Sequence, residues 1–367
     1  MLRHIPPSSP PPSQTTYALC RRGLQLGSIV LSGRPGRPSD AEVVAAWRAD
    51  QPVMLPSMLD VAAAEADIRQ AHLLMKHVLD SGSMVAMLDA PPCTRRLAGK
   101  FTLVAVSGEE HDAQGIEKLY FDACQDDTVV AEDLWCKASW LSFHDEDASL
   151  RFRFSFGMEG FEDVAADPER QRRAGRLTEA IFPESRAITE NETLLPLLRA
   201  VLGSDPAFVE RIVYFNAPNG GAQMHHDVER GHAGVIYGQL SGSTFWLAAA
   251  KPVLMDELII FARHHPDAIA EVLPDAAARK ELTLLLADRP ALSGYMDEPD
   301  HELVEAVMDR SPAFVHHMVS RRYGYVLHPG DVLLLPQRDL EACVWHTVFC
   351  LDDAPGEGLS FAIRGSD

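Results

Sequence analysis

The sequence has few of the features that mark secreted, membrane-spanning or disulfide-rich proteins. No apolar run approaches the roughly 18 residues that a transmembrane helix needs, so none is expected. The N-terminus lacks the apolar segment of a secretory signal. The six cysteines show no CxxC spacing, which favours reduced thiols in a cytoplasmic protein.

Positive charge is also scarce. The chain has 33 Lys and Arg residues against 53 Asp and Glu residues, a formal net charge of −20. A protein that binds nucleic acid needs a basic surface to meet the phosphate backbone, so this class is not expected. A basic peptide or a small molecule remains compatible with the charge, although acidity is also a common aid to solubility.

The composition is that of an ordinary globular protein, with 46% hydrophobic and 23% charged residues in 367. We expect three parts: a flexible Pro/Ser-rich leader over 1–16, a mixed α/β region over 17–135, and a β-rich region over 136–367. Within the second part, the apolar runs at 84–90 (MVAMLDA) and 100–106 (KFTLVAV) are typical of strands.

The β-rich region has short apolar runs separated by Gly- and Pro-containing turns from Arg211 onward. Helical spacing interrupts these runs at about 253–320. The pattern predicts a mainly β protein with some α structure, built as a β-barrel or jelly roll with a helical insert. An alternating stretch at 150–156 predicts a further strand, whose polar face carries Arg151 and Arg153 and either holds an anion or is simply exposed.

The stretch Gln223–Asp227, QMHHD, raises the question of a metal site. His225 and Asp227 are two residues apart, so on an extended segment their side chains point to the same side. His346 lies in a later apolar strand, CVWHTVFC, and is a candidate third ligand. Two histidines and one carboxylate leave open positions on an octahedral iron(II) ion. His226 or His232 are alternatives to His225, but the HxD spacing favours His225.

Two longer patterns accompany these residues and resemble the JmjC and cupin-type iron(II)/2-oxoglutarate-dependent oxygenases over about residues 205–365. In those proteins a HxD motif precedes a strand with a Q-x-x-G-x-K-x-W-x-L pattern, and a distal histidine follows a G-D-x-x-x-x-P turn. The residues that match are Gln239, Gly242 and Trp246 in the first pattern, where Leu247 stands one position earlier than the leucine of the pattern, and Gly330, Asp331, Pro336 and His346 in the second.

The resemblance implies a double-stranded β-helix in which His225, Asp227 and His346 hold iron(II). It also implies 2-oxoglutarate as co-substrate and hydroxylation of a C–H bond. One departure concerns the co-substrate, because Thr244 stands where JmjC members commonly carry a lysine for its distal carboxylate. Related oxygenases use an R-x-S pair on the last strand, which points to Arg364 and Ser366.

The remaining candidates are side chains near the expected iron. Thr244 and Tyr214 are further partners for 2-oxoglutarate, and weaker candidates line a substrate pocket: Trp246, Tyr237 and Gln239.

The leading hypothesis is a 2-oxoglutarate-dependent hydroxylase acting on an amino-acid residue in a peptide or protein, or on a related small molecule. Two alternatives stay open: a cupin-type iron enzyme that does not use 2-oxoglutarate, and a non-catalytic cupin-like binding protein. No nucleic-acid or membrane partner is expected, and a homodimer is left open. Nothing in the sequence assigns a role to the 17–135 region or to the insert.

Overall fold

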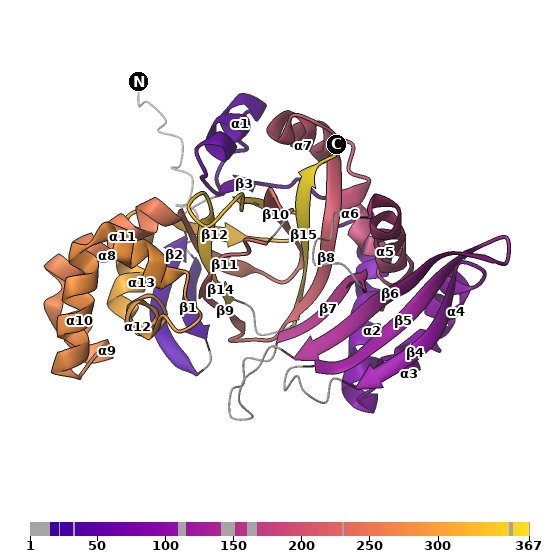
Figure 1. Cartoon of the computed structure of the whole chain (residues 1–367), viewed down its shortest axis with the longest axis horizontal. Helices are drawn as coiled ribbons and strands as arrows, with labels where there is room; N and C mark the ends of the chain where they lie inside the picture. Colours follow the sequence, from indigo (N-terminus) through magenta and orange to yellow (C-terminus); the bar gives the residue numbers. More distant parts are fainter. Residues whose placement is uncertain are drawn as a thin grey trace, which may run out of the picture.

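The protein is mainly β with helices, arranged around large antiparallel sheets (Figure 1). The computed structural model describes residues 15–21, 23–31, 34–108, 115–140, 151–159, 167–229, 231–351 and 355–366. Residues 1–14 of the expected leader lie outside the described residues. No helix in the described ranges combines the length and apolarity needed to span a bilayer. All six cysteines are free thiols.

Two facing antiparallel sheets form the centre of the molecule. Along the chain, strands alternate between these sheets except that two successive strands, β11 and β12, belong to the same one. In the first sheet the order is β13 (Val332–Pro336), β10 (Gly234–Ser241), β15 (Gly356–Gly365) and β8 (Pro206–Asn216). In the second it is β12 (Gly324–Leu327), β11 (Thr244–Ala250), β14 (Val344–Cys350) and β9 (Gly221–His225).

The first sheet continues beyond these four strands on both sides, to nine strands in all. On one side β3 pairs with β13, and on the other β7 pairs with β8. The added strands are β3 (Val53–Leu55), β7 (Arg151–Met158), β6 (Thr128–Trp140), β5 (Gly115–Gln125) and β4 (Phe101–Gly108).

The 17–135 region is therefore interleaved with the β-rich region. The boundary expected at residue 135 falls inside β6, in the middle of a continuous sheet. Helices from the region and from the segment before β8 pack on the outer face of this sheet (Figure 1). They are α1 (Asp40–Arg48), α2 (Glu65–Ser81), α3 (Met84–Leu88), α4 (Pro91–Leu97), α5 (Pro168–Ile181), the 3-10 turn η1 (Pro183–Ser185), α6 (Arg186–Thr189) and α7 (Leu194–Leu202).

The strand expected at 84–90 is a wrong prediction. Residues 84–88 form helix α3, because the Ser83 side chain accepts a hydrogen bond from the Val85 N–H and caps a helical turn. The other expected strand of this region is present as β4, whose residues are largely exposed.

The helical insert is present and begins slightly earlier than expected, directly after β11. It packs on the outer face of the second sheet, together with the hairpin of β1 (Thr15–Arg21) and β2 (Leu24–Leu31) (Figure 1). Its helices are α8 (Lys251–His264), α9 (Pro266–Val272), α10 (Ala276–Ala287), α11 (Arg289–Met296), α12 (Glu302–Arg310) and α13 (Pro312–Ser320).

Strand alternation divides the core into layers. Alternate side chains of β10 and β15 pack outward under the helices, including Ile236 and Phe361. The intervening ones face the second sheet: Tyr237 packs against Trp246 of β11, and Ala362 belongs to the same buried cluster. This inner layer between the two sheets contains the site described next.

Candidate functional site

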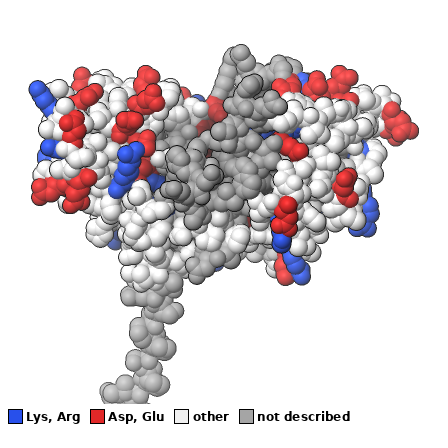
Figure 2. Space-filling model, turned by 90° about the horizontal axis from the view of Figure 1, so that it is seen from below, with Lys and Arg blue, Asp and Glu red and all other residues white. Residues whose placement is uncertain are grey.

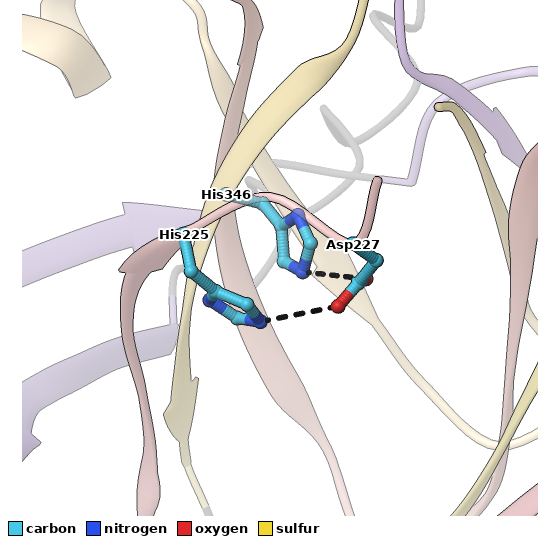
Figure 3. A group of neighbouring side chains, drawn as sticks. All are labelled: His225, Asp227 and His346. Atoms are coloured by element: carbon cyan, nitrogen blue, oxygen red, sulfur yellow. Dashed lines mark ion pairs between the residues drawn. The ribbon is translucent and has the colours of Figure 1, made fainter. Parts of the chain in front are cut away.

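The three expected metal ligands converge at one end of the inner layer (Figure 3). His225, the last residue of β9, lies directly opposite His346 of β14 in the antiparallel register. Asp227 follows on the loop after β9 and faces both imidazoles. His225 Nε2 is 3.5 Å from Asp227 Oδ1, and His346 Nε2 is 3.4 Å from Asp227 Oδ2.

The chain orients both histidines through the ring nitrogen that faces away from Asp227. His225 Nδ1 lies 2.7 Å from the Gln223 carbonyl oxygen, and His346 Nδ1 lies 3.5 Å from the Val344 carbonyl oxygen. A carbonyl can only accept, so Nδ1 carries the proton and the Nε2 lone pair is left for a metal. This is the tautomer that a metal-ligating histidine needs.

The ligands differ in their access to solvent. The His346 side chain is 3% exposed, whereas those of His225 and Asp227 are 41% and 36% exposed. The group is thus anchored on its barrel side and open on the other. Its donor atoms lie within 4.8 Å of one another, which suits a facial two-histidine, one-carboxylate set with free coordination positions.

The alternative histidines lie elsewhere. His226 packs edge-on against Trp345, with ring centroids 5.1 Å apart, and accepts a hydrogen bond from the Val228 N–H. Burial lowers the pKa of His226, as expected for a side chain held against the insert side of the second sheet. His232 belongs to a different group of side chains, with Glu210 and Glu229.

Trp246 supports the buried ligand. Its ring stacks on His346 with centroids 5.2 Å apart and an interplanar angle of 26°. Its indole N–H donates to Thr244 Oγ1 over 2.9 Å, which fixes the ring in place. Trp246, expected as a pocket residue, therefore also positions His346.

Two residues that the sequence did not single out support the strand that carries His225: Asp309 of the insert and Arg21 of the β1–β2 hairpin. Asp309 of α12 accepts a hydrogen bond from the Met224 N–H over 2.9 Å. The same carboxylate pairs with Arg21 of β1 over 2.6 Å, and both side chains are almost completely buried. Arg21 and Asp309 are 288 positions apart in the sequence, and no local sequence pattern predicts such a contact.

At the far end of the inner layer, Thr244 belongs to a buried neutral network. Its hydroxyl donates to Gln239 Oε1 over 2.8 Å, and the Tyr237 hydroxyl donates to the same oxygen over 3.1 Å. Both hydrogen-bond partners of Thr244, Gln239 and Trp246, are uncharged. The expected residues Thr244, Gln239 and Tyr237 thus come together as a packed network, and within the described part of the chain the side chains that hydrogen-bond Thr244 carry no positive charge for a carboxylate.

Arg364 and Ser366 lie at the other end of the inner layer from Thr244. Ile363, beside Arg364, pairs with Gly234 at the start of β10, whereas Thr244 bonds Gln239 near its end. The five residue steps from Gly234 to Gln239 span about 17 Å. One carboxylate cannot contact both Arg364 and Thr244, so this expected combination is not formed. Arg364 and Ser366 instead line a cavity of about 410 Å³ beside α5.

Tyr214 of β8 faces the inner layer, next to Arg153 of β7 in the sheet register. The polar face expected for the strand at 150–156 is partly realised: Arg153 is half-buried and Ser155 is buried, while the Arg151 side chain lies outside the described residues.

A second charged group lies close to the metal ligands. Burial, with the negative charges of Glu229 and Asp227, raises the pKa of Glu210 to about 7, and Arg153 partly offsets this shift. Figure 2 shows further acidic side chains on both flanks of the face seen there, consistent with the negative net charge.

No protein-family model and no curated protein matches the sequence. Among solved structures, two low-identity likenesses span most of the chain. One is the non-heme alpha ketoglutarate dependent epimerase SnoN from nogalamycin biosynthesis, at 11% identity over 89% of this chain and 80% of that one, with a TM-score of 0.36. The other is an oxidoreductase of the 2OG-Fe(II) oxygenase family from Burkholderia pseudomallei, at 9% identity over 91% and 98%, with a TM-score of 0.32.

Proposed function

We propose that the protein is an iron(II)-dependent oxygenase that uses 2-oxoglutarate as co-substrate. The observation that carries the proposal is the geometry of His225, Asp227 and His346. Two imidazole Nε2 atoms and one carboxylate converge on a point that is closed by protein on one side and open on the other.

The arrangement of strands supports the same proposal. The eight strands β8 to β15 divide between two facing sheets in the order expected of a double-stranded β-helix. In such a fold the ligand strands β9 and β14 are neighbours, as the pairing of His225 with His346 requires. The JmjC branch is not required by the site, because Thr244 replaces the lysine that is common there.

Bound iron(II) would activate dioxygen, and the residues of the chain would hold the ion and orient its ligands. His225, Asp227 and His346 hold the ion on one face. Trp246 and the carbonyl of Gln223 orient the imidazoles, and the neutral wall of Thr244 and Gln239 closes the inner end. We propose hydroxylation of an amino-acid residue in a peptide or protein, or of a related small molecule, as the reaction.

Arg364 is the candidate partner for the distal carboxylate of 2-oxoglutarate. It stands on β15 at the metal end of the inner layer, since Ile363 pairs with Gly234 and Ala362 faces the second sheet. Its guanidinium offers the paired donors that a carboxylate takes. Ser366 lines the same cavity, whose lining includes none of the three proposed metal ligands. Thr244 is too far along β10 from Arg364 to share the task.

One observation favours a second candidate, an iron enzyme that does not use 2-oxoglutarate. Among the residues that the structure describes, the hydrogen-bond partners of the Thr244 side chain include no cation, and Thr244 is where the lysine of the resembled family would stand. Succinate formed from 2-oxoglutarate in an oxygen-dependent manner separates the two candidates.

The test is anaerobic titration with iron(II), with and without 2-oxoglutarate, followed by the weak visible charge-transfer band of the chelate. We expect a band that needs both additions, is absent in His225→Ala, and is weakened in Arg364→Ala. His226→Ala is the matched control, because this neighbouring imidazole packs against Trp345 and should leave the band intact. Iron binding without any band on addition of 2-oxoglutarate would favour the second candidate.

A further inference from the structure

A second group of potential metal ligands lies beside the proposed iron site. Glu210, Glu229 and His232 each present one donor atom, and these atoms lie within 4.8 Å of one another. None of the three belongs to the His225, Asp227 and His346 group. We propose that they form a second site, which binds a divalent metal ion; this goes beyond the oxygenase function proposed above.

The fold builds this group from two elements that are tied together. The register of β8 against β15 shifts between Ala362 and Ile363, and Glu210 pairs with Ala362 at this bulge. A bulge redirects a side chain relative to the regular alternation of the strand. Glu210 is thereby placed at the edge of the inner layer, towards the loop that follows β9.

The other two ligands come from a tight turn in that loop. The His232 N–H donates to the Glu229 carbonyl over 3.2 Å, and Gly231 takes a φ of 87°, which favours glycine. The next residue, Ala233, donates to the Ile363 carbonyl over 2.7 Å. The turn is therefore fastened to the bulge that carries Glu210, and the three side chains meet through backbone contacts of the fold.

The donor set suits a cation. Two carboxylates held this close repel each other unless a proton or a cation lies between them; Asp227 adds negative charge nearby, and Arg153 offsets only part of it. His232 is 8% exposed and supplies a nitrogen donor, while Glu229 is exposed and leaves an approach from solvent. One imidazole with two carboxylates is a common set for zinc or manganese, with water completing the coordination.

The two sites share one segment. Asp227 belongs to the first site, and Glu229 and His232, which stand two and five positions later in the sequence, belong to the second. A metal ion in the second site would restrict this loop and so fix the Asp227 carboxylate in front of His225 and His346. The two sites are thus expected to bind metal with positive coupling.

The experiment is equilibrium dialysis of the metal-free full-length protein against manganese(II), which needs no oxygen control and no substrate. We expect two equivalents for the wild type. Glu210→Gln and His232→Gln should each bind one, His225→Ala should bind one, and Glu302→Gln, an exposed carboxyl on α12, should bind two. Circular dichroism spectra establish that each variant is folded.

Two results would overturn the second site. The first is that the wild type binds one equivalent of manganese(II) and that only His225→Ala abolishes this binding. That result would not contradict the proposed iron site. The second is retention of two equivalents in both Glu210→Gln and His232→Gln, which places the second ion elsewhere. Failure of the oxygenase proposal gives a different pattern: no charge-transfer band, whatever the stoichiometry of manganese.

Discussion

Trp246 restricts the orientation of His346, a proposed metal ligand, through a few direct contacts. The indole ring lies flat against His346 and is itself held through its N–H by Thr244. An imidazole fixed in this way does not have to be ordered when metal binds, so the entropic cost of binding is smaller.

Replacing this residue tests its role. We expect Trp246→Phe to keep part of the stacking but to lose the hydrogen bond to Thr244, and to weaken iron(II) binding by about 10-fold, the lower end of the range for residues that support metal ligands. Trp345→Phe is a matched control on the other face of β14. Dialysis against iron(II) measures both, and equal affinities for the two variants would contradict a positioning role for Trp246.

A buried pair of carboxyl groups gives a residue-level prediction for stability. Burial raises the pKa of Glu184 to about 8, and burial with the charge of Glu184 raises that of Glu357 well above its usual range. His72 lies 3.6 Å from Glu357, but burial lowers its pKa, so it stays neutral near pH 7 and above. Asp67 raises and Arg96 lowers the pKa of Glu184. Folding therefore favours the protonated pair.

The sign follows from the raised pKa. The folded state binds more protons than the unfolded state between the unfolded pKa of Glu, about 4.3, and the folded value near 8, so stability falls as pH rises through this window. We expect a loss on the order of a few kcal/mol between pH 5 and 9. Urea unfolding measures it. Glu184→Gln should flatten the profile, and an unchanged slope in that variant would assign the dependence to other groups.

Strand β9 shows how one element depends on distant ones. It carries His225 at its end, pairs with β14 on one side, and is held by Asp309 of the insert on the other. Asp309 is itself paired with Arg21 from the beginning of the described chain. The insert and the β1–β2 hairpin thus support the strand that carries one ligand of the proposed metal site.

We expect Asp309→Asn to lower the free energy of unfolding by about 3–5 kcal/mol, because it leaves the buried Arg21 charge uncompensated. It should also weaken metal binding through β9. Asp256→Asn breaks an exposed ion pair with Arg289 on the same insert and should cost no more than about 1 kcal/mol. Thermal unfolding of both variants, with and without metal, makes the comparison; similar losses would argue against a special role for Asp309.

The grouping of His225, Asp227 and His346 could be predicted because its signal is local: HxD at a strand end and a histidine in an apolar strand. The partner for 2-oxoglutarate could not, because whether Thr244 and Arg364 meet depends on sheet register, which no short motif encodes. The helix at 84–88 was missed for a related reason, since a short apolar run fits a strand or a buried helix equally well.

At the scale of the whole molecule, the nine-stranded sheet joins the N-terminal region to the barrel. Strand β3 pairs with β13, and the helices α1 to α4 cover the outer side chains of the first sheet. Of the strands in the N-terminal region, the sequence patterns predicted β4 but not β3, and the alternation of hydrophobic residues does not tell which strands become neighbours.

This arrangement predicts the behaviour of a shortened chain. A piece consisting of residues 136–367 would expose outer side chains such as Ile236, Leu334 and Phe361, each worth about 1.5–3 kcal/mol when buried. We expect it to aggregate or to lack a cooperative unfolding transition, as measured by gel filtration and thermal melting. A chain that lacks only residues 1–14 is the control and should fold. A monomeric, cooperatively melting 136–367 piece would instead support a domain boundary at residue 135.

The stacking of Trp246 on His346 also has a practical consequence. A paramagnetic or strongly absorbing ion bound at His346 would lie within a few ångströms of an indole ring, close enough to quench its emission. The chain therefore carries its own optical reporter of occupancy, and the loss of tryptophan fluorescence on adding metal would follow loading of the first site without any added label.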